Sequence, residues 1–436
     1  MAFLFSENSY VGPAAVPWRE LTVFCHLRQN HLLVRWPCCP PALTSAPAFR
    51  DFTDGLTGVS NMTGFTRLVL IALASLALTA PASAQQGTPV VAAAVTEVRP
   101  SEKIDAYAPR FGRTRPVIAV LGENSGTVMS DFVLPYGVLA QSGVADVVSV
   151  ATQAGLLQLP PLKIAPDNTV AQFDQRYPDG ADYVVVPAMN KSGDPTLLAW
   201  VGAQAAKGAT MVSICNGSIV LAKAGLTRGH RATGHWSTHQ SRVAAFPETV
   251  WLKNTRYVAD GKIVSSAGIS AAIPTALALV EAIGGSERAR VLATQLGMAD
   301  WGSAHNSDSF HITFGDRVTA VISYFLRPTQ DIGIPVADGV DELALSLTAD
   351  AYTATLRARV HALAQSDSPV RTRNGLMLVP DMVAGRGKQP ESILPGFDST
   401  PSALVLDKAL DDITTRYGAA AARFVVLEAE YPRQGR

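Results

Sequence analysis

The 436-residue sequence has no surplus of either charge, since 36 Lys and Arg residues stand against 36 Asp and Glu residues. Nucleic-acid-binding proteins and polybasic membrane-surface proteins carry a cationic excess, so the balance argues against both classes. Charged residues are also scarce, at 17%, whereas hydrophobic residues make up 47%. That composition excludes wholesale disorder. The length predicts two or three domains.

The sequence also lacks an apolar run long enough to span a bilayer comfortably. Its longest run is Leu68–Ala80 (LVLIALASLALTA), preceded by a short segment from Met62 with one positive charge at Arg67. The sequence Ala-Ser-Ala at positions 82–84 follows and is typical of a cleavage site. These features indicate a signal peptide at residues 62–84, and therefore a periplasmic or secreted protein. The alternative for the apolar run is a buried core helix.

A signal peptide should begin near the start of translation, yet 61 residues precede Met62. Residues 1–61 show no sustained helical or strand period. We therefore expect translation to begin at Met62 and residues 1–61 to come from an overlong gene model.

Cysteine is scarce, with four residues in the whole chain. Cleavage after Ala84 would leave 352 residues and remove Cys25, Cys38 and Cys39. Cys215 would then be the single thiol, so an intramolecular disulfide is excluded for the mature chain. A lone thiol in an oxidising compartment is either buried and inert or reactive for a reason.

Alternating apolar runs and amphipathic segments predict an α/β domain at residues 112–297, after a linker at 85–111. Its sheet should be parallel, because segments of helical length separate the strands. The predicted strands are Pro116–Leu121, Asp146–Ala151, Asp182–Pro187, Ala209–Ile214 and Lys262–Ser265. The predicted helices are Asp131–Ser142, Pro195–Lys207, Gly217–Ala224, Ser270–Ile283 and a last one that begins near Ser286 and ends at Leu296.

Residues 298–436 have a weaker pattern and no assignable role. We predict a mostly helical extension, with helical spacing at Asp341–Leu363 and a closing helix at Ala403–Tyr417. A strand is expected at Gly375–Val379, and Gly385–Gly396 has the composition of a loop.

Chemistry concentrates at Gly208–Gly225 (GATMVSICNGSIVLAKAG), where a predicted strand leads directly to Cys215. A nucleophile at a strand-to-helix turn is exposed, and the N–H groups of the helix favour its thiolate. That position lowers a cysteine pKa from about 8.5 to roughly 3.5–7.5. Gly217 would let the turn pack tightly. The alternative is a buried strand-end cysteine without a function.

This segment resembles the ThiJ/PfpI family, a branch of the class I glutamine amidotransferase-like superfamily. The matching motifs are the elbow Ser213–Leu226, the segment Arg228–Trp236 with its Thr233-Gly234-His235-Trp236 end, Gly261–Ile269 and the helix Ala271–Ile283. The resemblance covers about Arg115–Gly297. It implies a flavodoxin-like α/β sandwich with Cys215 at a nucleophile elbow.

The resemblance also implies partners for the thiol. An acidic side chain after the first strand should hydrogen-bond the sulfur, and that position falls on Asp131, with Glu123 as a second choice. Asp131 could instead satisfy backbone donors at its own helix N-terminus. His235 matches the histidine that approaches the thiol, and His239 is a weaker alternative. His305 and His311 lie outside the matching block and receive no role.

The expected oxyanion pocket involves Asn216, Gly217 and Ala188. Many relatives have a Pro-Gly-Gly turn after the third strand, but here the turn contains Ala188 in place of the first glycine. Its N–H can still contribute, whereas its side chain narrows the pocket. Gly234 is a second departure from the family pattern and loosens the approach to His235.

These features predict an exported protein whose reactive Cys215 acts on a small electrophilic or amide-like molecule, as a hydrolase or a hydratase/lyase. The alternative is a non-catalytic small-molecule-binding or redox-sensing protein with the same pocket; a structural envelope role is a third reading. The sequence indicates no cofactor, and its histidines lack a metal-ligand spacing. The expected partner is a small molecule, with no nucleic acid, no membrane after signal-peptide cleavage, and a homodimer suggested by the relatives.

Overall fold

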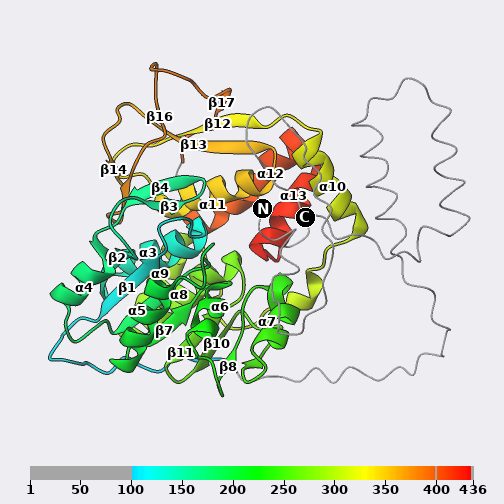
Figure 1. Ribbon diagram of the computed structural model, residues 1–436. Coiled ribbons are helices and arrows are strands. Elements are labelled where there is room, and N and C mark those ends of the chain that lie inside the picture. Colours follow the sequence, from blue (N-terminus) through cyan, green and yellow to red (C-terminus); the bar gives the residue numbers. More distant parts are fainter. Residues whose placement is uncertain (1–100, 398–399, 434–436) are drawn as a thin grey trace, which may run out of the picture. The chain divides into compact units, whose positions relative to one another are not determined.

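The computed structural model describes residues 101–397 and 400–433, so the predictions for residues 1–100 lie outside the described residues. The centre of the fold is a seven-stranded sheet of order β10-β11-β7-β6-β1-β2-β5 (Figure 1). Its strands pair in parallel except β10, which is antiparallel to β11. The strands are β1 (Val117–Gly122), β2 (Asp146–Ala151), β5 (Asn168–Thr169), β6 (Tyr183–Val186), β7 (Thr210–Ser213), β10 (Tyr257–Asp260) and β11 (Ile263–Ser266).

Alternate residues of β1 enter two separate hydrophobic cores, as expected for a strand covered on both faces. Ile118 and Val120 pack with α3 (Met129–Ser142) and α8 (Ala272–Gly284), and α9 (Ser286–Leu296) joins this core. The neighbouring residues of β1 pack with α4 (Val170–Arg176), α5 (Pro195–Ala206) and α6 (Gly217–Lys223). The predicted three-layer α/β sandwich is confirmed.

The helices and strands predicted for the sandwich agree closely with those observed. β2 and α9 have the predicted bounds, and β1, β6, β7 and β11 differ by one or two residues. α3 begins at Met129, two residues before the predicted start, and η3 (Ile269–Ala271) precedes α8. The described end of the predicted linker packs on the sandwich, where Ile104 is buried and Tyr107 N donates to Ala282 O at 2.9 Å.

The C-terminal region contains the expected helices together with a sheet that the sequence pattern did not predict. Its parallel sheet has the order β16-β13-β12-β17. The strands are β12 (Gln330–Pro335), β13 (Ala358–Ala364), β16 (Met382–Val383) and β17 (Ser392–Ile393), and the helices are α10 (Phe314–Phe325), α11 (Glu342–Ala354), α12 (Val405–Tyr417) and α13 (Ala419–Ala429).

The predicted helix at Asp341–Leu363 is wrong in its second half. α11 ends at Ala354, the chain turns through Leu356 with a φ of +58°, and β13 follows. Buried and more exposed residues alternate at the start of β13, which is the period of a strand. The apolar residues therefore keep a helical period by coincidence beyond the end of α11, and the turn there contains neither Gly nor Pro to mark it.

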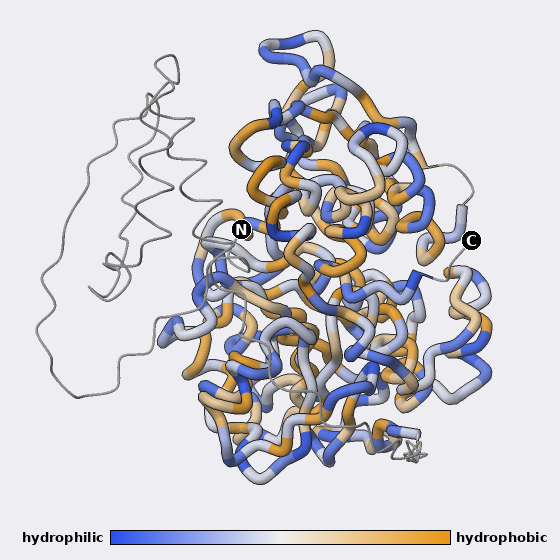
Figure 2. Tube along the Cα trace, turned by 90° about the vertical axis from the view of Figure 1, so that its right-hand side faces the viewer, coloured by the Kyte–Doolittle hydropathy of each residue, from blue (hydrophilic) through white to orange (hydrophobic). Residues whose placement is uncertain are grey.

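A small antiparallel sheet joins the two regions. β3 (Leu157–Leu159) and β4 (Leu162–Ala165) come from the sandwich, and β14 (Val370–Arg371) and β15 (Met377–Leu378) come from the C-terminal region. α3 and α11 also share one hydrophobic core. Hydrophobic segments run through both regions in Figure 2. β8 (Arg231–Ala232) and β9 (Val250–Trp251) form a further two-stranded ladder, and α7 (His239–Ala245) lies between them in sequence.

Candidate functional site

Four polar segments meet at the carboxyl edge of the central sheet. Asp131 follows β1, Ala188 follows β6, Cys215 follows β7 and Gly268 follows β11. The carboxyl ends of parallel strands share one edge, and ligands bind there in open α/β sheets. The order β11-β7-β6-β1 places these four connections side by side.

The backbone at the Cys215 elbow is strained, but the thiol is buried, so the expected exposure of this side chain is wrong. Its φ is +57°, a left-handed value that is uncommon for a residue with a side chain. Its N–H donates to Ala267 O at 3.0 Å, and the N–H of Asn216 points at the sulfur. A Cβ added at Gly217 would lie 1.8 Å from Val186 O, so only glycine fits at the first residue of α6.

Asp131, at the N-terminal end of α3, is the acid beside the thiol. Its side chain is fully buried, and Oδ2 accepts a hydrogen bond from Ala188 N at 3.2 Å. The Cys215 thiol acts as a second donor to this carboxyl. Oδ1 nevertheless has no partner with normal hydrogen-bond geometry. The second choice, Glu123, accepts from Ser125 N at 3.1 Å and stabilises its own turn.

Burial raises the pKa of the Cys215 thiol well above its usual range, and the carboxylates of Asp131 and Glu430 add to the rise. The Asn216 N–H and the Arg242 guanidinium oppose it. Burial also raises the pKa of Asp131, with a contribution from Asp350. The expected lowering of the thiol pKa is therefore wrong, because desolvation outweighs the helix N-terminus. Both shifts favour the protonated forms, a neutral thiol beside a neutral carboxyl.

Of the two N–H groups expected in the oxyanion pocket, those of Asn216 and Ala188, only the first is free to serve there. The Asn216 N–H faces the reacting sulfur. The Ala188 N–H donates to Asp131 instead, so it orients the acid and is not presented to a substrate oxygen. The side chain of Ala188 is buried.

His235 is buried, but both of its ring nitrogens have partners away from the thiol. Nδ1 lies 2.8 Å from Ser237 Oγ, and Nε2 lies 3.2 Å from the carbonyl oxygen of Glu428. A carbonyl only accepts, so Nε2 carries the proton and Nδ1 accepts from Ser237. Burial lowers the pKa of His235, which favours the neutral ring. These contacts give His235 a structural connection to α13; the alternative, His239, begins α7 and its pKa is also lowered by burial.

A buried arginine that the sequence analysis did not single out also acts on the thiol. Arg242 of α7 is 1% exposed, donates to His235 O at 2.8 Å and lies 3.5 Å from Asn216 Oδ1. Burial lowers its pKa to about 10, whereas the Cys215 thiolate and Glu430 favour its charge. Arg242 is therefore a cation available to stabilise negative charge on sulfur.

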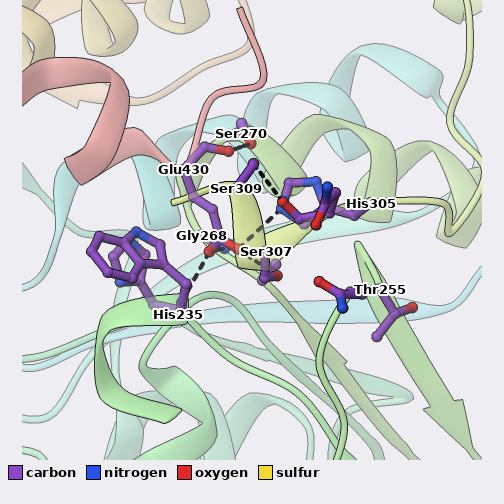
Figure 3. Close-up of polar contacts among 12 residues, drawn as sticks. His235, Thr255, Gly268, Ser270, His305, Ser307, Ser309 and Glu430 are labelled. Atoms are coloured by element: carbon purple, nitrogen blue, oxygen red, sulfur yellow. Dashed lines mark hydrogen bonds and ion pairs between the residues drawn. The ribbon is translucent and has the colours of Figure 1, made fainter. Parts of the chain in front are cut away.

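The C-terminal region also contributes directly to the site, through Glu430 just after α13 (Figure 3). Its carboxylate is fully buried and accepts from Gly268 N at 2.8 Å, Trp236 N at 3.2 Å, His305 Nε2 at 3.0 Å and Ser307 Oγ at 2.8 Å. Burial would raise its pKa, but the hydrogen bonds from His305 and Ser307 lower it overall. His305, which received no role from the sequence, thus belongs to this cluster.

Asp350 of α11 holds the start of α3. Its Oδ2 accepts from Ser130 N at 2.9 Å, and burial raises its pKa to about 6. Ser130 directly precedes the catalytic candidate Asp131, and the negative charge of Asp350 adds to the rise in the pKa of Asp131. Asp350, Arg242 and Glu430 carry no local motif, so only their long-range contacts identify them.

Two further observations limit the chemistry. Among residues 101–397 and 400–433, no group of three His, Cys, Asp or Glu side chains is arranged to hold a metal ion. No helix in the same residues combines the length and apolar character needed to cross a bilayer.

Residues 118–282 match the DJ-1/PfpI family. Isonitrile hydratase of Pseudomonas putida is 36% identical over 153 residues, which cover 35% of this chain and 62% of the relative. The HTH-type transcriptional regulator CdhR of Pseudomonas aeruginosa is 33% identical over 101 residues, which cover 23% of this chain and 30% of the relative. The chain thus spans less than two thirds of either relative.

Solved structures of the same group resemble the sandwich. DJ-1beta of Drosophila melanogaster has a TM-score of 0.39 and 22% identity, and the match covers 42% of this chain and 99% of that one. A ThiJ/PfpI family protein of Pseudomonas syringae has a TM-score of 0.38 and 22% identity, with 44% and 82% covered. The resemblance read from the elbow motifs is confirmed: residues 118–282 of the chain match the model of the DJ-1/PfpI family.

Proposed function

We propose that the protein is a cysteine-dependent enzyme in which Cys215 and Asp131 act as a thiol–carboxyl pair on a small electrophilic molecule. The observation that carries this proposal is the left-handed elbow that holds the Cys215 thiol against the buried carboxyl of Asp131. The similarity to an isonitrile hydratase supports an isonitrile as the first substrate class to test. The active reaction would then be hydration to an N-substituted formamide.

A protonated thiol beside a protonated carboxyl suits this chemistry. The formamide gains one hydrogen on carbon and one on nitrogen; the first comes from the thiol and the second from water. The Cys215 sulfur adds to the isonitrile carbon, and Asp131 carries the thiol proton to the same carbon, which gives a thioimidate. Water then adds across the carbon–nitrogen double bond, with its oxygen on carbon and one of its protons on nitrogen. The carbon–sulfur bond breaks, and the remaining hydroxyl proton passes through Asp131 to sulfur as the formamide leaves. Asp131 is a proton carrier in both steps.

Two groups are placed to stabilise the sulfur while it carries negative charge. The Asn216 N–H points at it, and the Arg242 guanidinium lowers the pKa of the thiol. Each acts in a buried site, where an electrostatic interaction is stronger than in water. They offset the desolvation that keeps the resting thiol protonated.

Export and a homodimer belong to the same proposal. The signal peptide predicted at residues 62–84 supports a periplasmic or secreted location, and the resemblance to the DJ-1/PfpI family supports the dimer. Neither is needed for the thiol–carboxyl chemistry.

The test is to incubate the full chain with an alkyl isonitrile and quantify the N-substituted formamide by chromatography. We expect turnover by the wild type, and a loss of about 10³-fold or more in Cys215→Ala and Cys215→Ser. Urea unfolding of each variant checks that the fold is intact. Formamide production by folded Cys215→Ala at the wild-type rate would falsify the proposal.

The same preparations separate catalysis from the alternative, a non-catalytic binding or redox-sensing protein. A sensor should form sulfenic or sulfinic acid at Cys215 under mild peroxide and release no product. The raised pKa of the buried thiol works against that oxidation, because the thiolate is the reactive form. Peptide mass spectrometry of Cys215 distinguishes the two outcomes.

A further inference from the structure

Glu430 is an unusual residue for the end of a helix. It is 0% exposed and has a φ of +50°, a left-handed conformation that side chains other than Gly, Asn and Asp rarely adopt. The Ser270 hydroxyl also donates to its carbonyl oxygen at 2.5 Å. A strained, buried and charged residue persists only where its surroundings hold it firmly.

One carboxylate oxygen of Glu430 connects to the elbow through a single peptide group. The carbonyl of Ala267 accepts from Cys215 N at 3.0 Å, and the N–H of the same peptide, on Gly268, donates to Glu430 Oε2 at 2.8 Å. Hydrogen bonds joined through one peptide polarise each other. The carboxylate therefore strengthens the bond that fixes the backbone of Cys215.

The same oxygen connects to Arg242 through a second peptide group. The carbonyl of His235 accepts from Arg242 Nη1 at 2.8 Å, and the N–H of that peptide, on Trp236, donates to Glu430 Oε2 at 3.2 Å. Both connections therefore end on Glu430 Oε2, one from the nucleophile and one from the buried cation beside it. Figure 3 shows the Glu430 carboxylate between His235 and His305, with Gly268 beside it.

The position of the Glu430 carboxylate requires a glycine at residue 268. A Cβ there would lie 2.7 Å from Glu430 Cβ, 2.7 Å from His235 Cδ2 and 2.9 Å from Glu430 Oε2. The other carboxylate oxygen is held by His305 and Ser307, so four donors from three chain segments fix one group. This count is enough to satisfy a buried carboxylate.

We propose that Glu430 is a positioning residue of the Cys215 site, through which the C-terminal region holds the elbow backbone and Arg242 in their working geometry. The catalytic importance of this geometry rests on the proposed function, whereas the experiments that measure the geometry do not. It gives residues 298–433 a role that the family domain does not supply. Asp131, Glu430 and Arg242 are the titratable groups that act on the thiol, and His305 and His235 face Glu430.

The test compares Glu430→Gln with Glu430→Asp in the full chain. Glu430→Gln removes the negative charge and places an NH2 group against the four hydrogen-bond donors that surround the carboxylate. Glu430→Asp keeps the charge, but its shorter side chain brings the carboxylate less close to those donors. Glu428→Gln is the matched control: Glu428 is a half-buried residue in the last turn of α13, desolvation raises its pKa, and the substitution keeps the carbonyl that His235 contacts.

The first measurement is hydrogen exchange of the peptide that contains Cys215. We expect exchange of the elbow amides to increase about 10-fold or more in both Glu430 variants, and to stay at the wild-type rate in Glu428→Gln. A merely structural role in α13 would change exchange in α13 alone, and that outcome would overturn the proposal.

The second measurement is the pH dependence of Cys215 alkylation by iodoacetamide, followed by peptide mass spectrometry. We expect the midpoint to move down by about one pH unit in Glu430→Gln, a 10-fold effect at fixed pH, since a nearby negative charge is lost. Glu430→Asp should keep the wild-type midpoint. Wild-type midpoints in both variants, with wild-type elbow exchange, contradict the positioning role.

These readouts do not depend on turnover. If the wild type hydrates no isonitrile but Glu430→Gln changes elbow exchange and the alkylation midpoint, the proposed function fails and the positioning role stands. If the wild type is active and both readouts are unchanged in the folded variants, the positioning role fails alone. Should Glu430→Gln not fold, elbow exchange in Glu430→Asp decides.

Discussion

Two buried carboxyl groups act on the same thiol, and their surroundings give them opposite charge states. Asp131 accepts one N–H, from Ala188, and a weak thiol donor, so burial dominates and its pKa rises. Glu430 accepts from four donors, and its pKa falls although it is equally buried. The number and strength of donors, more than depth in the protein, decide whether a buried carboxyl ionises.

The difference in pKa between Asp131 and Glu430 suits the two carboxyl groups to different roles at the site. A neutral carboxyl beside the sulfur holds a proton that can move, whereas a fixed carboxylate with every acceptor position used cannot exchange one readily. The family domain thus supplies the group suited to proton transfer, and the C-terminal region supplies the group suited to holding backbone in place.

The largest effect should come from Asp131→Asn, which is close in shape to the neutral acid but carries no transferable proton. We expect isonitrile turnover to fall by about 10²–10⁴-fold, while the free energy of unfolding in urea is retained or increased. The wild-type rate should also decline as pH rises through the raised pKa of Asp131, because the protonated form is lost. Wild-type turnover in Asp131→Asn would place the proton carrier elsewhere.

A smaller effect is expected at Asp350, which tests whether burial of its carboxylate opposes folding. Its pKa is about 6 when folded and about 3.8 when unfolded, so the folded state binds the extra proton between these values. The stabilisation is complete below about pH 4 and is lost as pH rises through about 6, by roughly 2–3 kcal/mol.

Asp350→Asn keeps an acceptor for Ser130 N and removes this titration. The difference in unfolding free energy between variant and wild type, measured in urea, should grow in favour of the variant from pH 4 to pH 7. A difference that is constant over this range is the contradictory result.

The smallest effect is expected for Ser307→Ala, which removes one of the four donors to Glu430. We expect a loss of about 1 kcal/mol in unfolding free energy near neutral pH, because a buried carboxylate acceptor is left short of a partner. Ser309→Ala is the control, since its hydroxyl donates to Asn306 O at an exposed position where water can replace it. Equal losses in the two variants would show that burial of the acceptor does not matter here.

The sandwich and the elbow could be predicted from the sequence because their signals are local. β-rich runs predicted five of the seven strands of the central sheet to within one residue, and β5 and β10 were missed. Gly217, two positions after Cys215, marked the tight turn. Asp131 could be placed beside the thiol only through the family resemblance. The charge state of the thiol could not be predicted, since it depends on desolvation by segments far away in sequence.

Glu430, His305 and Arg242 illustrate what local patterns omit. Glu430 meets Gly268 across 162 residues and His305 across 125. Arg242 sits in a short polar helix whose composition resembles an exposed surface, yet it is 1% exposed. β13 was missed because apolar residues at Asp341–Leu363 satisfied a helical period across a turn.

The small sheet that joins β4 to β15 has a consequence for how the chain folds. Beside it, Lys163 contacts Asp381 across 218 residues, and Ser130 contacts Asp350 across 220. Such distant pairings are slow to form, because the entropy of closing a long loop is lost before any contact stabilises it. A nascent chain that ends shortly after α9 would leave the apolar faces of α3 and β4 without their partners. We therefore expect the sandwich to need chaperone protection until the C-terminal region emerges.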